Sequence, residues 1–140
     1  MPIYVNLPVA DLDASKAFYE GLGFSIDPRF TDEKAAAVVL EEGITVMLLR
    51  NEFFTTFTKR PVATDGIEVI NSIEAASREK ADELAEKAFA IGGSVTVDPQ
   101  DMGWMYSRSF ADPDGHHWEV MYADEAAMAE AFAAEGTPGT

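Results

Sequence analysis

The sequence predicts a single α+β domain made of two βαβββ repeats. Its 140 residues are enough to bury one hydrophobic core, and 47% of them are hydrophobic. Both halves follow the same order of elements, in which a strand precedes an amphipathic helix and three further strands. Short stretches also recur at one constant offset, which indicates an internal duplication. The matched stretches are Lys16-Ala17-Phe18 with Lys87-Ala88-Phe89, Gly21 with Gly92, and Asp27-Pro28 with Asp98-Pro99.

The first repeat begins with residues 3–9, which alternate apolar and polar side chains, as a strand covered on one face does. The helix that follows has Asp11 or Asp13 as its N-cap, and Gly21 and Gly23 end it. The buried stripe of this helix consists of Ala17, Phe18 and Leu22. Three further strands are predicted at residues 24–30, 35–40 and 44–49.

The second repeat begins with a strand predicted at residues 67–73. Ser77 is the N-cap of its helix, which ends at Gly92-Gly93. The buried stripe of this helix consists of Leu84, Ala88 and Ile91. Three further strands are predicted at residues 94–97, 104–110 and 117–122.

We therefore expect one domain, residues 1–140, that contains two modules at about 3–50 and 67–122. A connector with a short helical turn, residues 51–66, joins the modules. A last helix, residues 124–134, has apolar positions at helical spacing. This helix is expected to pack on the sheet or on a second chain.

Three phenylalanines, Phe53, Phe54 and Phe57, lie in the connector. Exposed rings there would be costly unless they cover a pocket or meet a partner chain. The alternative is that they pack onto the domain's own core.

The chain is strongly acidic, with 25 acidic against 10 basic residues and a formal net charge of −15. This charge disfavours nucleic acid and anionic membranes as partners, and it makes a cationic ligand the more natural guest. Solubility alone explains most of the acidity. The chain has no cysteine, which excludes disulfides, thiolate nucleophiles and thiolate metal sites. Because it shows neither a signal-peptide pattern nor a long apolar run, we expect a cytoplasmic protein.

The turn at residues 112–115, Asp-Pro-Asp-Gly, organises the second repeat, because proline and glycine in this order favour a tight turn between two strands. In the strand after it, alternation places His117 and Glu119 on one face and Trp118 on the other. Imidazole and carboxylate so placed can perform general acid–base chemistry. The alternative is a hydrogen-bonded pair that only anchors the hairpin.

The chain resembles the vicinal oxygen chelate superfamily, the group of glyoxalase I, bleomycin-resistance proteins and extradiol dioxygenases. The resemblance rests on the two βαβββ units, on the helix end SKAFYEGLGF at residues 15–24, and on Asp-Pro-Asp-Gly-x-x-x-Glu at residues 112–119. It covers residues 3–122 and is strongest to bacterial proteins labelled as predicted lactoylglutathione lyases. It implies the glyoxalase/bleomycin-resistance fold, in which curved mixed sheets form half-cups with the helices outside and the ligand inside. It also implies a homodimer with paired sheets.

The resemblance implies four positions for a divalent metal, one on the first and one on the fourth strand of each unit. They fall on Tyr4, Met47, Ile70 and Glu119, of which only Glu119 is an ordinary ligand. We therefore expect no cofactor.

The alternative is a displaced metal site, in which His117 and Glu119 are completed by Asn6 or Glu68. Nucleophilic catalysis by a Ser–His–Glu set is no better supported, because no strained elbow positions Ser107 or Ser109.

The strand faces opposite the helices should line the ligand cup. Arg108 is assigned instead to the helix face, where it needs an acidic partner, unless a one-residue shift of register turns it into the cup as an anion anchor. Three aliphatic faces should lie under the helices: Ile3/Val5/Leu7, Ile44/Val46/Leu48 and Ile67/Val69/Ile73. The predicted ligand-binding residues are Tyr4, Asn6, Met47, Ile70, Ser72, Met105, Ser107 and Ser109.

We expect a homodimeric protein that binds a small organic molecule without a metal. The acidity favours a cationic ligand, as in the bleomycin-resistance proteins. The alternative is a glyoxalase-type lyase, isomerase or transferase in which Glu119 and His117 act with a non-standard metal site. A third hypothesis is a structural or regulatory protein whose cup is filled by its own side chains. Metal-dependent glyoxalase I activity is not expected.

Overall fold

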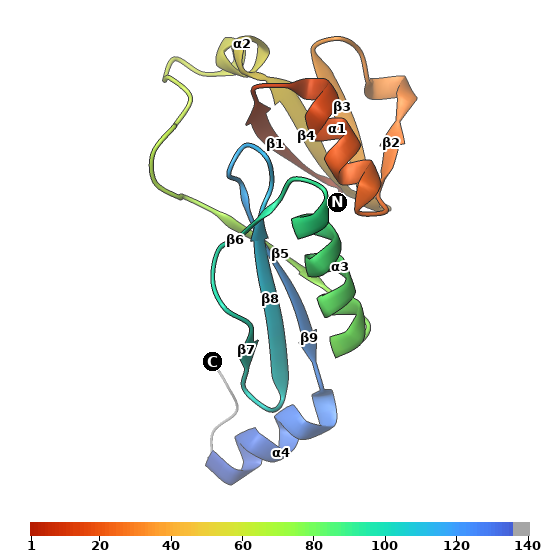
Figure 1. Ribbon diagram of the computed structural model, residues 1–140, viewed down its shortest axis with the longest axis vertical. Helices are drawn as coiled ribbons and strands as arrows, with labels where there is room; N and C mark the ends of the chain where they lie inside the picture. Colours follow the sequence, from red (N-terminus) through yellow and green to blue (C-terminus); the bar gives the residue numbers. More distant parts are fainter. Residues whose placement is uncertain (136–140) are drawn as a thin grey trace.

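The computed structural model describes residues 1–135 and contains two curved, open sheets of four and five strands, each covered on one face by a helix (Figure 1). The first sheet has the strand order β1-β4-β3-β2, and β1 runs parallel to β4. This arrangement confirms the α+β class of the first repeat. Its elements are β1 (Ile3–Val9), α1 (Leu12–Gly21), β2 (Ser25–Asp27), a 3₁₀ turn (Pro28–Phe30), β3 (Ala35–Glu41) and β4 (Ile44–Arg50).

The second sheet repeats this order as β5-β9-β8-β6, with β7 also paired to β8. The connector between the modules forms a short helix, α2, and a 3₁₀ turn, as predicted. The elements are α2 (Asn51–Phe54), the turn Thr55–Phe57, β5 (Ile70–Glu74), α3 (Arg78–Ala90), β6 (Ser94–Val95), β7 (Gln100–Asp101), β8 (Met105–Ala111), β9 (His117–Ala123) and α4 (Glu125–Glu135).

Local signals set the ends of the two long helices. The Asp11 side chain accepts a hydrogen bond from the backbone N of Ala14, and the Ser77 side chain accepts one from that of Lys80, so both predicted N-caps are confirmed. At the end of α3, a Cβ on Gly93 would lie 2.8 Å from the Ala88 oxygen. Glycine is therefore needed there for close packing of the backbone.

Three strands, β2, β5 and β6, are shorter than predicted. β2 ends at Asp27, because Pro28 opens a 3₁₀ turn and the Asp27 side chain accepts from the backbone N of Arg29. β5 begins at Ile70, which pairs with the first residue of β9. The residues before Ile70 have no strand beside them. Ile67 and Val69 are accordingly 51% and 57% exposed, so their predicted place under a helix is wrong.

One continuous core joins the two modules. Phe18 and Tyr19 of α1 are fully buried, and their rings lie 6.2 Å from Phe110 and 5.9 Å from Trp118 of the second module, respectively. Of the predicted α1 stripe, Phe18 and Leu22 are buried, whereas Ala17 is exposed on the outer side.

The buried stripe of α3 consists of small residues. Ala81, Ala85 and Ala88 have no exposed surface, and Leu84 packs against the core from one side. Ile91 is 37% exposed, so its predicted burial is wrong. It lies after the last helical residue, at the C-cap of α3.

The helix α4 lies beyond the end of the second sheet, away from α1 and α3 (Figure 1). Asp124 caps it by accepting from the backbone N of Ala127, and the Phe132 ring packs on Trp104 with centroids 5.2 Å apart. Among residues 1–135, no helix has the length and apolar character needed to cross a membrane.

Candidate functional site

The inner face of the second sheet carries the predicted polar pair. Trp118 and Val120 are buried on the helix side of β9, which leaves His117 and Glu119 half-buried on the opposite face. The hydroxyl of Ser72 on the adjacent strand β5 donates to Glu119 Oε1 over 3.1 Å. In the described part of the chain, His117 makes no hydrogen bond to Glu119. The carboxylate is therefore held by Ser72 instead of by the predicted imidazole partner.

The inner face of the first sheet combines aromatic and apolar side chains with polar ones, among them Thr45 and Glu41. Tyr4 is 62% exposed there, and it lines a cavity of about 220 Å³ together with Met47. The sequence reasoning missed Phe30 and Arg29, which line the same cavity because the 3₁₀ turn carries them to its rim. The Asp27-Pro28 pair, typical of a turn start, was the available signal.

The predicted ligand-binding residues fall into two groups. Asn6 pairs in register with Met47 on the first sheet, and Ser109 pairs with Glu119 on the second. No residue of the second sheet lines the cavity beside Tyr4.

The other predicted lining residues differ in accessibility. Ile70 is 57% exposed and Met105 is half-buried, whereas Ser107 is only 2% exposed. Ser107 lies between its cross-strand neighbours Gln100 and Met121, so the unpredicted strand β7 restricts access to it.

The four positions that the resemblance implies for a metal do not form a ligand set. Tyr4, Met47 and Ile70 supply a phenol, a thioether and an alkyl group, none of which suits a hard or borderline divalent ion. Among residues 1–135, no three His, Asp or Glu side chains gather as a metal shell would require. One oxygen of the remaining ligand, Glu119, already accepts from Ser72. The donor set therefore does not fit a divalent metal.

Arg108 lies on the helix face, so the predicted register of β8 is confirmed. Its guanidinium donates to Asp82 Oδ1 and Glu86 Oε1 of α3, each over 2.7 Å. The Tyr106 hydroxyl also donates to Asp82. Hydrogen bonds from Tyr106 and then Arg108 lower the pKa of Asp82. Arg108 is a structural residue and does not face the cup.

The turn before β9 connects the two modules through buried hydrogen bonds. The Tyr19 hydroxyl of α1 donates to Asp112 Oδ2 over 2.5 Å, and Trp118 Nε1 donates to the same hydroxyl over 3.0 Å. Burial raises the pKa of Asp112, and burial followed by the Asp112 charge raises the pKa of Tyr19. The motif that organises the second repeat also fixes its position on the first.

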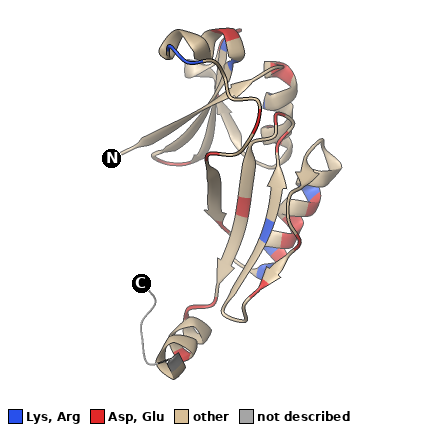
Figure 2. Ribbon diagram, turned by 90° about the vertical axis from the view of Figure 1, so that its left-hand side faces the viewer, with Lys and Arg blue, Asp and Glu red and all other residues tan. Residues whose placement is uncertain are grey.

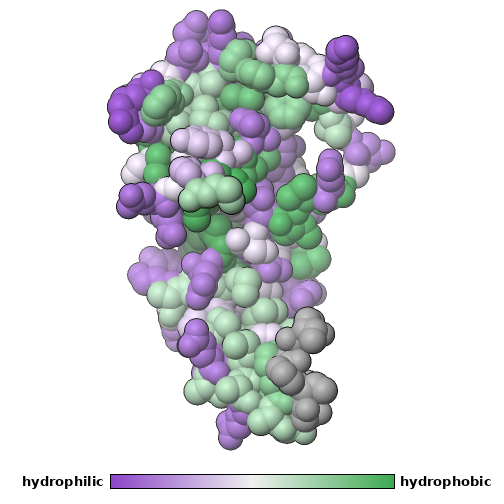
Figure 3. All heavy atoms as spheres, turned by 180° about the vertical axis from the view of Figure 1, so that it is seen from behind, coloured by the Kyte–Doolittle hydropathy of each residue, from purple (hydrophilic) through white to green (hydrophobic). Residues whose placement is uncertain are grey.

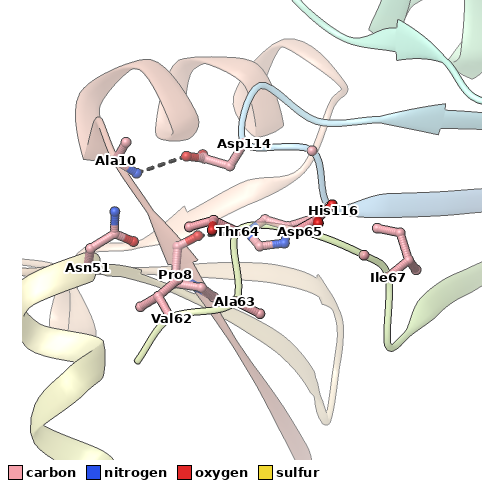
Figure 4. Close-up of a pocket in the computed structure, with 12 residues that line it drawn as sticks. Pro8, Ala10, Asn51, Val62, Ala63, Thr64, Asp65, Ile67, Asp114 and His116 are labelled. Carbon is pink, nitrogen blue, oxygen red and sulfur yellow. Dashed lines mark hydrogen bonds between the residues drawn. The ribbon is translucent and has the colours of Figure 1, made fainter. Parts of the chain in front are cut away.

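A cavity of about 490 Å³ lies beside this turn, under connector residues 62–67 (Figure 4). Asp114 Oδ1 accepts from the backbone N of Ala10 over 2.8 Å, and His116 Nε2 lies 2.7 Å from the Pro8 carbonyl. Since a carbonyl only accepts, Nε2 of His116 carries the proton. The sequence did not reveal this cavity, because four separate segments of the chain form it. Asp114 and His116 on its wall help hold the modules together.

Comparison with known proteins identifies the fold. A hypothetical protein, SA1046, from S. aureus is 31% identical, with a TM-score of 0.79 over 88% of this chain and 94% of that chain. A glyoxalase-related enzyme from Fulvimarina pelagi is 22% identical, with a TM-score of 0.75 and 87% of each chain covered. A lactoylglutathione lyase from Agrobacterium tumefaciens is 19% identical, with a TM-score of 0.64 over 89% of this chain and 95% of that chain. None of the curated proteins matches the sequence.

The family model of the Glyoxalase/Bleomycin resistance protein/Dioxygenase superfamily matches residues 3–120, which include both βαβββ units and Glu119. The match covers most of the chain, and the resemblance expected from the repeats and from the Asp-Pro-Asp-Gly turn is confirmed. The chain belongs to the Glyoxalase/Bleomycin resistance protein/Dioxygenase superfamily.

Proposed function

We propose that the chain binds a small organic molecule on the inner faces of its sheets and that this binding needs no metal. The observation that carries the proposal is the make-up of these faces. Tyr4 and Phe30 are 62% and 61% exposed on the first, and Ile70 is 57% exposed on the second. Large apolar side chains at such exposure favour contact with a ligand or a second chain.

The proposal includes a homodimer, because each sheet of a single chain is curved and open on its inner face. Figure 3 shows apolar side chains at the surface of the upper half of the molecule, seen from behind. Pairing the first sheet of one copy with the second sheet of another would bring the rings of Tyr4 and Phe30 opposite Glu119. The net charge of −15 favours a cationic ligand in such a cup.

The second candidate is a glyoxalase-type lyase, isomerase or transferase. It is favoured by the Ser72–Glu119 hydrogen bond, which orients a half-buried carboxylate two residues from an imidazole. In this candidate Glu119 and His117 would move a proton or hold a metal in a displaced site. The metal-free binder ranks first, because Glu119 is the only ordinary ligand among the four metal positions.

The two candidates are separated by thermal unfolding of chelator-treated protein with Ni, Zn, Mn, Fe(II) and Mg added singly. An ion that binds only the folded state stabilises it by about 2.7 kcal/mol at a hundredfold excess over its dissociation constant. We expect no shift of the melting temperature with any of these ions. A large shift that disappears in Glu119→Gln but persists in the control Glu79→Gln, on the exposed side of α3, would favour the enzyme.

Ligand binding is tested by a calorimetric screen of small cationic, neutral and anionic aromatic compounds. We expect a cationic or neutral compound to bind, and we expect Tyr4→Ala to weaken it about tenfold through loss of aromatic contact area. If the wild-type protein bound none of these compounds at a concentration at which it is oligomeric, this result would favour the third hypothesis, a structural or regulatory protein.

A further inference from the structure

The helix α4 has little covering within its own chain. Its main side-chain contact is the stacking of Phe132 on Trp104, while Ala126, Ala129 and Ala133 are exposed. A helix of 11 residues is marginal in water by itself and gains most of its stability from packing. This small-residue face therefore needs a surface that a single chain does not supply.

The helix is also acidic. Residues 124–135 contain four acidic side chains and no lysine or arginine. Glu125 and Glu130 are exposed. A surface that covers this helix should carry positive charge together with apolar groups.

Such a surface exists at the opposite end of the molecule, around α2. Residues 50–64 have a net charge of +2, although the chain as a whole carries −15, so all other residues together carry −17. Figure 2 shows basic residues on the loop beside α2. Within residues 1–135, Lys34, Lys59 and Arg60 take part in no ion pair.

Aromatic rings lie among these charges. Phe57 is 69% exposed and packs on Phe53 with ring centroids 5.0 Å apart, and Lys34 Nζ lies 5.7 Å from the centre of the Phe53 ring. A hollow of about 300 Å³, enough for one or two side chains, is bordered by Lys34, Arg50, Glu52, Phe53 and Thr56, and Glu52 pairs with Arg50 over 3.8 Å. We call this surface the basic pole and define it by Lys34, Arg50, Phe53, Phe57, Lys59 and Arg60.

We propose that α4 of one copy docks on the basic pole of a second copy, and that the contact is reciprocal. The two surfaces have complementary charge, and each has apolar groups at its centre. Since α2 and α4 lie at opposite ends of an elongated chain (Figure 1), a two-fold axis near the middle would form both contacts at once and close the assembly. This inference deepens the proposed function and rests on the homodimer proposed there.

A second copy fits the basic pole better than a membrane or a nucleic acid does. Either of these extended polyanions would face the −17 charge of the rest of the chain as well as the pole. In the proposed contact the acidic helix of the second copy faces the pole, while the rest of that copy meets this chain through the paired sheets. Because it belongs to a copy held in place by the paired sheets, its effective concentration is also high.

The first test is charge exchange, read by sedimentation equilibrium at low salt. We expect K59E/R60E to weaken the dimer about tenfold or more, and E125K/E130K to do the same, since each replaces attraction by repulsion in two symmetric contacts. The variant with all four changes should return to within a few-fold of wild type. K80E/K87E, on α3, is the matched control and should leave the dimer unchanged.

The second test uses the absence of cysteine from the chain. We expect Thr56→Cys protein mixed with Ala129→Cys protein to form an interchain disulfide, whereas Ala90→Cys mixed with Ala129→Cys should not. A chain with both Thr56→Cys and Ala129→Cys should stop at a covalent dimer. A ladder of longer products would show open head-to-tail assembly and would overturn the reciprocal contact.

The outcomes separate this inference from the proposed function. A wild-type dimer that is indifferent to all the charge variants would overturn the docking while leaving the dimer intact. A wild-type monomer would overturn both the dimer and the docking, and the ligand screen would still decide on metal-free binding. If K59E/R60E abolished binding to anionic phosphatidylserine vesicles and left the dimer unchanged, the basic pole would be a membrane surface and the docking would be wrong.

Discussion

The two modules hold their helices on their sheets by different means. α1 buries the aromatic side chains Phe18 and Tyr19, whereas α3 buries only alanines, among them Ala85. The small residues of α3 allow its acidic side chains to meet Tyr106 and Arg108 of β8. One repeated pattern of elements can therefore be stabilised by aromatic packing in one copy and by close approach with polar contacts in the other.

The inner faces differ in the same way. The first presents the rings of Tyr4 and Phe30 and the thioether of Met47 beside the charged Arg29, and the second presents Ser72, His117 and Glu119. The two sheets share the strand order of their first four strands, so this difference resides in side chains and in the additional strand β7. The two inner faces of a duplicated fold therefore offer different groups to a ligand.

The largest expected effect comes from the aromatic packing of α1. We expect Phe18→Ala to lower the free energy of unfolding by about 3–5 kcal/mol, because it leaves a cavity between both modules. Urea unfolding measures this loss. The exposed Phe57→Ala should stay within about 0.5 kcal/mol of wild type. A similar loss in the two variants would mean that Phe18 is not part of the core.

The second-largest effect is expected from loss of the buried hydrogen bonds of Tyr19. Tyr19→Phe removes a donor to Asp112 and an acceptor for Trp118, for which we expect a loss of about 2–3 kcal/mol at pH 7. The folded-state pKa of Asp112 is raised above its unfolded value, so protonation of this group favours folding as the pH falls. Burial causes this rise, whereas the Tyr19 hydrogen bond lowers the pKa of Asp112, because it stabilises the charged carboxylate. The bond therefore contributes less once Asp112 is protonated, and the difference between Tyr19→Phe and wild type should shrink toward pH 4. Denaturant unfolding at a series of pH values tests this, and a difference that grows on acidification would contradict it.

Enlarging a buried alanine tests how closely α3 packs on its sheet. Ala85 has no exposed surface, so Ala85→Leu should destabilise the protein by about 1–3 kcal/mol through overpacking. The same change at the exposed Ala90 serves as a control and should have little effect. Thermal unfolding of both variants compares them. Tolerance of leucine at position 85 would show that α3 can move away from the sheet.

The smallest effect is expected for the ion pair of α3. Asp82→Asn should cost less than about 1 kcal/mol at pH 7, because Asp82 is partly exposed and solvent screens the pair. The folded pKa of Asp82 lies below its unfolded value, so its contribution is present at neutral pH and is lost as the pH falls below about 4 through the lowered pKa. Asp98→Asn is the control. A difference between Asp82→Asn and wild type that persists at pH 2 would contradict the ionic origin.

Local chemistry predicted many features correctly. Asp11 and Ser77 cap their helices because their oxygens can satisfy free backbone N–H groups wherever a helix starts. Alternation placed Trp118 and Arg108 on the helix faces, since side chains of a strand alternate regardless of what packs on it. The sequence reasoning failed at Ile67 and Val69, where strand formation depends on a neighbouring strand that is absent.

The sequence by itself determined the repeated βαβββ order, the family and the scarcity of metal ligands, because these depend on side-chain periodicity and on residue identity. The tertiary structure decided which groups meet across the chain. Tyr19 and Asp112 bond although 93 positions separate them, and Glu119 pairs with Ser72 instead of His117. It also placed an acidic helix and a basic pole at opposite ends of one molecule. Such relations depend on how separate elements pack, and no local pattern of residues records them.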